Sequence, residues 1–99
     1  MTDVAELDAP PTWSLGSVRI EELRSFLVLS ETLNVRQAAA RLLVSPGGLS
    51  RRITHLEAAI GVELLRTSTR GVTLTDQGAA FSAAVRSALG LLGGLPSAA

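Results

Sequence analysis

The chain contains no cysteine and no lysine, a single histidine, one tryptophan, two phenylalanines and no tyrosine. The absence of cysteine excludes disulfides and thiolate metal sites, and one histidine cannot build a zinc site alone. Without lysine there is no P-loop, and acidic, histidine and nucleophilic side chains do not cluster as a catalytic set would. We therefore expect a protein that is not an enzyme and that uses no metal and no cofactor.

Neither end of the chain has the pattern of a targeting or membrane segment. The N-terminal residues lack a basic start and an apolar run, which argues against a signal peptide. The apolar stretch near the C-terminus is interrupted by Arg86 and several glycines and is too short to span a bilayer. The sequence therefore predicts a soluble, cytoplasmic protein that does not contact a membrane.

The formal net charge is zero, but the charges are unevenly distributed. The first eighteen residues contain three acidic side chains and no basic one, whereas residues 34–70 contain six arginines against two glutamates, a local charge of +4. The local field, not the total charge, attracts a polyanion. Arginine also presents a planar set of donors that suits phosphates and guanine edges.

Residues 1–17 are acidic and include Pro10 and Pro11, a composition that predicts a flexible leader. The sequence leaves open whether Trp13 packs on the domain. A first helix is expected over residues 19–33, with Ser17 as its N-cap. Helical spacing predicts that its buried face consists of Ile20, Leu23, Phe26, Leu27 and Ser30.

A helix-turn-helix is expected over residues 34–60. Asn34 and Gln37 have the spacing of a capping box, and Ser45 followed by Pro46 is typical of the start of the next helix. Gly61 is placed to end that helix. The second helix has one apolar face, opposite a polar face with Arg51 and Thr54; the apolar residues recur at helical spacing and are Leu49, Ile53, Leu56 and Ile60.

A hairpin and a last helix follow. Leu64 and Leu65, a polar stretch over residues 66–71 and the alternating residues 72–74 predict a β-hairpin of the kind called a wing. Thr75 can cap a helix over residues 76–92, beyond which several glycines and a proline predict a frayed end. Its apolar repeat consists of Phe81, Val85, Ala88 and Leu92.

Five motifs follow one another at fixed spacing over about residues 19–92: Leu23-Arg24-Ser25-Phe26; Ala38-Ala39 with Arg41-Leu42 and Val44-Ser45; Leu49-Ser50-Arg51 with Ile53 and Leu56-Glu57; Gly61-Val62 with Leu64; and Arg70-Gly71-Val72 with Leu74-Thr75 and Gly78. The ordered set resembles the DNA-binding domain of LysR-type transcriptional regulators. The resemblance implies a mainly α winged helix-turn-helix over residues 18–75, with the helix-turn-helix at about 35–54, and a linker and dimerisation helix over 76–99. It also implies a bacterial protein associated with the nucleoid.

The resemblance implies sequence-specific binding of double-stranded DNA, with the helix over about residues 46–60 in the major groove and the wing in the minor groove. Arg51 is expected to contact a base, and Arg70 to enter the minor groove. Arg41 is expected to pair with Glu31 or Glu57. For Thr54 and His55 a solvated side chain without a role is the alternative. The full predicted set is Arg36, Ser45, Pro46, Gly47, Ser50, Arg51, Thr54, His55, Arg66 and Arg70.

The sequence departs from the family at the start of the recognition helix. The family has Gln at position 46, Pro or Ser at 47 and Ala at 48, where this chain has Pro46, Gly47 and Gly48. The long side chain that reaches a base edge is therefore missing. We expect weaker direct readout than is usual in the family, with more weight on phosphates and DNA shape.

The family also implies a homodimer through the last helix, which would bind an inverted repeat. The alternative is that this helix only packs on the core of its own domain. A second functional hypothesis is an interaction module that forms heterodimers with a full-length relative and blocks its DNA binding. Family members carry a ligand-sensing domain after this helix, and the sequence leaves open whether these residues are a protein without that domain or a fragment. The residues expected to dimerise are Phe81, Val85, Ala88, Leu89 and Leu92.

Overall fold

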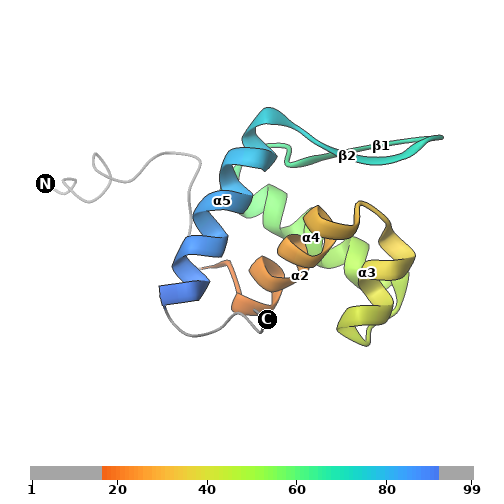
Figure 1. Cartoon of the computed structure of the whole chain (residues 1–99), viewed down its shortest axis with the longest axis horizontal. Coiled ribbons are helices and arrows are strands. Elements are labelled where there is room, and N and C mark those ends of the chain that lie inside the picture. Colours follow the sequence, from red (N-terminus) through yellow and green to blue (C-terminus); the bar gives the residue numbers. More distant parts are fainter. Residues whose placement is uncertain (1–16, 92–99) are drawn as a thin grey trace, which may run out of the picture.

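The computed structural model describes residues 17–91, so the predicted leader up to residue 16 and the predicted frayed end, including Leu92, lie outside it. Within this range the fold is mainly α, with a two-stranded antiparallel wing (Figure 1), as the sequence predicted. The elements in chain order are α2 (Ile20–Thr32), α3 (Val35–Leu42), α4 (Pro46–Ile60), β1 (Leu65–Ser68), β2 (Gly71–Leu74) and α5 (Asp76–Leu91).

Side-chain caps fix where three of the helices begin. Asn34 Oδ1 accepts a hydrogen bond from Gln37 N at 2.9 Å, and Ser45 Oγ accepts one from Gly48 N at 3.0 Å. Thr75 Oγ1 accepts one from Gly78 N at 2.9 Å. Each cap satisfies a backbone donor that the first helical turn leaves without a partner. These three helix starts are confirmed.

The first helix starts within one residue of the prediction, but its predicted N-cap is wrong. The N-cap of α2 is Arg19, not Ser17, and Glu22 Oε1 accepts a hydrogen bond from Arg19 N at 3.1 Å. This is the reach-back half of a capping box, which a glutamate at the third helical position can supply without a serine or threonine cap. No capping role was predicted for this glutamate from the sequence.

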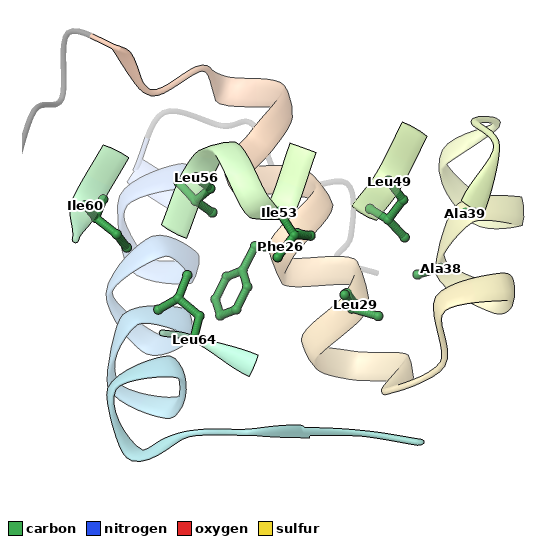
Figure 2. Close-up of a cluster of buried hydrophobic side chains, with 9 residues drawn as sticks. All are labelled: Phe26, Leu29, Ala38, Ala39, Leu49, Ile53, Leu56, Ile60 and Leu64. Carbon is green, nitrogen blue, oxygen red and sulfur yellow. The ribbon is translucent and has the colours of Figure 1, made fainter. Parts of the chain in front are cut away.

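The main core lies where α2, α3 and α4 meet. Figure 2 shows the apolar face of α4 directed toward Phe26 and Leu29 of α2, with Ala38 and Ala39 on the α3 side. The small alanines let α3 approach closely, as helix packing with small side chains permits. The apolar face predicted for α4 is confirmed, and its four residues are all buried: Leu49, Ile53, Leu56 and Ile60.

The buried face predicted for α2 is correct in part. Phe26 and Leu27 are buried as predicted, but Ile20 is 47% exposed. Glu22 and Ser25, which the prediction left out, are buried in a stripe that includes Phe26 and has helical spacing from residue 22. Two polar residues occupy it because α4 supplies partners for both side chains, as described below.

The wing is joined to α4 by hydrogen bonds at its base. Glu57 Oε2 accepts from the N–H groups of Leu64 at 2.8 Å and Leu65 at 3.1 Å, and Thr75 Oγ1 donates to Glu63 O at 2.6 Å. The strands pair in register from Leu65 opposite Leu74 to Ser68 opposite Gly71. These bonds fix the direction in which the hairpin leaves the domain.

α5 packs on α2 through a second, smaller cluster made by Leu27, Val85 and Leu89. Phe81 contacts Phe26, with ring centroids 5.6 Å apart. Val85 and Leu89, which the sequence assigned to a dimer interface, are thus 4% and 2% exposed within a single chain. For these two residues the structure has the intrachain packing that was the alternative. No helix within residues 17–91 is long and apolar enough to cross a membrane.

Candidate nucleic-acid interface

The first turns of α4 are exposed on the side opposite the core. Pro46 and Gly47 are exposed at the start of the helix, and Ser50, Arg51 and Thr54 follow along its outer side. The alternation of buried and exposed positions follows from helical spacing: the core fixes one face, so the other must face outward. The structure thus brings these predicted contact residues to one surface.

The arginines divide into paired and unpaired groups. Among residues 17–91, Arg19, Arg36, Arg51 and Arg70 are exposed and take part in no ion pair. Arg41 Nη2 lies 3.4 Å from Glu31 Oε1, so the predicted pairing with Glu31 is correct and the alternative with Glu57 is not. The paired arginines have their charge partly offset by a neighbouring carboxylate, whereas the unpaired ones present a full charge to any anion outside the chain.

Arg66, a predicted DNA contact, and Arg52, the neighbour of Arg51, are engaged within the chain. Both are therefore less available to bind DNA than the sequence indicated. Arg66 Nε lies 3.4 Å from Glu63 Oε1 at the base of the wing. Arg52, which follows Arg51, is half-buried and donates from Nη1 to the buried Ser25 Oγ at 3.1 Å. Arg52 therefore joins α4 to α2, a role that sequence spacing could not reveal because the two residues lie 27 positions apart.

The hairpin carries Arg70 at its tip. Gly71, next to it, has φ of 123°, a value that favours glycine and lets the chain turn. Ser68 Oγ accepts from Arg70 N at 3.1 Å within the turn. Figure 1 shows the hairpin extending toward the same end of the molecule as α3, away from α5. The unpaired Arg36 at the start of α3 and Arg70 at the wing tip thus belong to the same end of the fold.

A hollow of about 150 Å³ separates α4 from the wing. Ser50 and Thr54 line it from the helix, and Thr67 and Val72 line it from the hairpin. The rest of the lining is apolar apart from the carboxylate of Glu57, so the hydroxyl groups of Ser50, Thr54 and Thr67 are the polar groups without charge that it offers. The hollow therefore continues the exposed surface of α4 onto the wing.

Gly47 and Gly48 leave the first turn of α4 without side chains. An ideal Cβ on Gly47 would lie 3.8 Å from Arg51 Nη1, and one on Gly48 would lie 4.0 Å from Arg51 Nη2. The guanidinium of Arg51 therefore lies beside the glycine turn, in the direction in which helical side chains ordinarily lean. Neither glycine has a positive φ, so the backbone conformation does not itself require glycine.

His55 has a partner that the sequence analysis did not identify. Its Nδ1 lies 2.6 Å from Glu22 Oε2, across the contact between α4 and α2. The two residues are far apart in the sequence, and only the buried stripe of α2 could have indicated that Glu22 faces α4. The exposed histidine is thus held by a buried carboxylate. Within residues 17–91 no group of three histidine or acidic side chains could hold a metal ion.

The model of the lysR family of bacterial regulatory helix-turn-helix proteins matches residues 20–79. The HTH-type transcriptional regulator TcbR of Pseudomonas sp. (strain P51) is 40% identical over 76 residues, which are 77% of this chain and 26% of TcbR. YkuM of Bacillus subtilis (strain 168), also named as an HTH-type transcriptional regulator, is 41% identical over 61 residues, 62% of this chain and 21% of YkuM.

The solved structure of the CbnR DNA-binding domain in complex with DNA superposes with a TM-score of 0.73 at 40% identity, and the match covers 76% of this chain and 86% of that one. The chain spans about a quarter of the length of the curated relatives that it matches. The matched residues contain the whole of the helix-turn-helix and the wing. The chain belongs to the LysR family of bacterial regulatory helix-turn-helix proteins.

Proposed function

We propose that this chain binds double-stranded DNA as the DNA-binding part of a transcriptional regulator, with α4 in the major groove and the wing in a minor groove. Three of the exposed arginines that have no carboxylate partner carry the proposal, and they are Arg36, Arg51 and Arg70. They belong to α3, α4 and the wing, the three elements that frame one end of the fold. DNA is a polyanion of regular spacing, which such a set of charges can follow.

Arg51 is the proposed base-reading residue, because it is exposed on α4 and its guanidinium can make two hydrogen bonds to guanine. Such a pair contributes roughly 1–3 kcal/mol of discrimination against other bases. Ser45, Ser50 and Thr54 are the proposed hydroxyl contacts, and Arg36, Arg66 and His55 are proposed to contact phosphates.

Pro46 and Gly47 are proposed to contact DNA through backbone and ring atoms alone. They present no polar side chain to a base edge, so direct readout rests mainly on Arg51. Phosphate contacts and the shape of the DNA then account for most of the remaining affinity. Arg70 is proposed to enter a narrow minor groove, whose negative potential attracts arginine.

Dimerisation through α5 is proposed to use the side of this helix that does not pack on α2. Ala88 is exposed, Leu91 is 87% exposed, and Phe81 is only half-buried. Val85 and Leu89 support the helix from within the chain, and Leu92, which lies outside the described residues, is proposed to take part in the dimer contact. A two-fold dimer would present two copies of α4 to an inverted repeat.

Selection from random duplexes, followed by fluorescence anisotropy on the selected site, tests the proposal. If Arg36 and Arg66 each neutralise one phosphate, log Kd should rise with log salt at about 0.9 per contact, or about 1.8 per subunit. Arg36→Gln should weaken binding and lower this slope. Arg41→Gln is the matched control, because it removes an arginine of the same helix that is already paired with Glu31. A salt slope near zero would reject the electrostatic basis of the proposal.

Sedimentation of the purified chain and of Ala88→Glu tests the dimer. We expect the wild type to sediment as a dimer at micromolar concentration and the variant as a monomer, because the new charge would be buried at the interface. A monomeric wild type that still binds a single half-site would reject dimerisation through α5. A chain that binds no DNA alone but co-purifies with a longer relative would favour the interaction module instead.

A further inference from the structure

A buried carboxylate connects α2 to the recognition helix. Glu22 Oε2 lies 2.6 Å from His55 Nδ1, and Glu22 Oε1 accepts from Arg19 N at 3.1 Å. The side chain of Glu22 is 8% exposed, whereas that of His55 is 51% exposed. Both carboxylate oxygens are therefore engaged, and the imidazole is held at one nitrogen while half of its surface remains open to solvent.

The surroundings of His55 carry more positive than negative groups. An open hollow of about 340 Å³ is lined by Arg19, Glu21 and Glu22 from the start of α2 and by Arg52 and His55 from α4. Arg51 precedes His55 by four residues and is its neighbour along the exposed side of α4. The hollow itself is lined by two guanidinium groups, two carboxylates and the imidazole, and Arg51 adds a third guanidinium group outside it. An anion that approaches α4 on the C-terminal side of Arg51 meets the side chains that surround His55.

The contact with Glu22 determines which nitrogen of His55 is left for another partner. Nδ1 donates to the carboxylate, so Nε2 is the remaining polar atom of the ring. In the neutral ring Nε2 is an acceptor and repels a phosphate oxygen. In the protonated ring Nε2 is a donor that carries part of a positive charge, and a hydrogen bond to a phosphate becomes favourable.

We propose that His55 is a phosphate-contacting residue whose contribution to DNA binding depends on its protonation, and that Glu22 positions it. This inference rests on the DNA binding proposed above and adds a regulatory feature to that site. The ligand group is a phosphodiester of the DNA backbone adjacent to the base contacted by Arg51. DNA binding is then stronger at mildly acidic than at mildly basic pH, because the protonated imidazole binds the phosphate and the neutral one does not.

The composition of the chain allows a pH dependence of DNA binding to be assigned to one residue. His55 is the only histidine, and there is no cysteine. Apart from the N-terminal amino group, histidine is the side chain whose ordinary titration falls between about pH 5 and 8. A pH dependence of DNA binding in this range that disappears on replacing one residue can therefore be assigned to that residue.

The experiment measures Kd for the selected duplex by anisotropy between about pH 5.5 and pH 8 in phosphate-free buffers of constant ionic strength. The wild type should bind roughly three- to tenfold more tightly at the acidic end, the gain expected for one charge-assisted contact. His55→Gln should bind at every pH as the wild type does at pH 8. His55→Arg should bind tightly at every pH, because its charge does not titrate.

Glu22→Gln tests the positioning role. Its amide oxygen can still accept from Arg19 N, so the first turn of α2 keeps its cap. Its amide NH2 then faces His55 Nδ1 and donates to it, so the neutral ring carries its proton on Nε2 and can donate to a phosphate at pH 8. The affinity at pH 8 should therefore rise and the acidic gain should shrink. A loss of affinity at all pH values, with circular dichroism showing reduced helix content, would instead indicate a purely structural role and would overturn this part of the proposal.

Proton uptake provides an independent measurement. If the protonated form binds DNA more tightly, then DNA binding must in turn favour protonation. Calorimetric titrations in buffers of different ionisation enthalpy should show proton uptake near neutral pH for the wild type and none for His55→Arg. A flat pH profile, or one that His55→Gln retains in full, would overturn the inference while leaving the proposed DNA binding intact. Absence of DNA binding at every pH would instead reject the proposed function.

Discussion

Gly78, in the first turn of α5, packs directly against the carbonyl group of Leu64 at the start of the wing. An ideal Cβ on Gly78 would lie 2.9 Å from the carbonyl carbon of Leu64 and 3.2 Å from its Cα. The same Leu64 carbonyl accepts a hydrogen bond from Thr75 N at 3.0 Å. Backbone thus meets backbone where the wing and the last helix join, and neither side can yield by a simple side-chain rotation.

Gly78→Ala should therefore lower the free energy of unfolding by about 1–3 kcal/mol, the usual cost of forcing an extra methyl into a packed contact. Urea denaturation measures this change. Gly90→Ala is the matched control, because it lies in the same helix and no atom would come within 4 Å of the new Cβ. The control should gain up to about 1 kcal/mol from helix propensity. Equal stabilities for the two variants would contradict the packing argument.

Leu43 ends α3 in the left-handed conformation, with φ of 61°, and is 91% exposed. The strain of this conformation is about 1–2 kcal/mol for a residue with a Cβ, and the exposed side chain recovers little of it by burial. Leu43→Gly should raise the free energy of unfolding by about 1 kcal/mol, measured by urea denaturation.

Leu33 provides the comparison for this prediction. It has a similar φ of 52° but is only 41% exposed, so Leu33→Gly loses apolar contacts as well as strain. We expect Leu33→Gly to be less stable than Leu43→Gly. The strain argument fails if Leu43→Gly is less stable than the wild type.

The helix starts that rest on a local signal could be predicted from the sequence. Asn34, Ser45 and Thr75 each cap a donor three residues later, so the pattern and its partner lie in the same short stretch. The apolar face of α4 was predictable for the same reason, because helical spacing alone fixes it. The cap of α2 was not, because a glutamate in the first turn also has an explanation in the helix dipole.

Apart from the pairing of Arg41 with Glu31, the polar contacts between elements could not be predicted, because nothing in the spacing reveals them. Arg52 meets Ser25 across 27 positions, and Arg86 Nη1 reaches Glu31 Oε2 at 3.1 Å across 55. The contact between His55 and Glu22 is of the same kind. The last helix illustrates a related ambiguity: an apolar stripe has the same spacing whether it packs on its own domain or on a partner. Only the three-dimensional arrangement assigns Val85 and Leu89 to the chain's own core.

Glu57 holds the base of the wing, and its loss should loosen the hairpin. Glu57→Ala leaves the N–H groups of Leu64 and Leu65 without their acceptor, which should cost about 2 kcal/mol. Hydrogen exchange of these two amides should accelerate more than that of the α4 amides. Glu63→Gln is the control, since it removes only an exposed pair with Arg66, and it should change stability by less than about 1 kcal/mol. Unchanged protection of both amides would show that the wing is held by other contacts.

A substitution at Gly47 can separate an effect on stability from an effect on DNA binding. Its conformation does not require glycine, and an added Cβ would meet only Arg51 Nη1, at an ordinary 3.8 Å. Gly47→Ala should therefore raise the free energy of unfolding by up to about 1 kcal/mol through helix propensity. If DNA approaches the bare backbone of this turn, the same methyl should weaken binding severalfold, as anisotropy on the selected duplex will measure.

Gly90→Ala again serves as the control for Gly47→Ala, because it makes the same chemical change in a helix that is not proposed to touch DNA. Both variants should gain stability, and only Gly47→Ala should lose affinity. If Gly47→Ala gains stability and binds as the wild type does, the DNA does not approach this turn closely. The lack of side chains at residues 47 and 48 then has no effect on DNA recognition, and Arg51 alone defines the base contacts of α4.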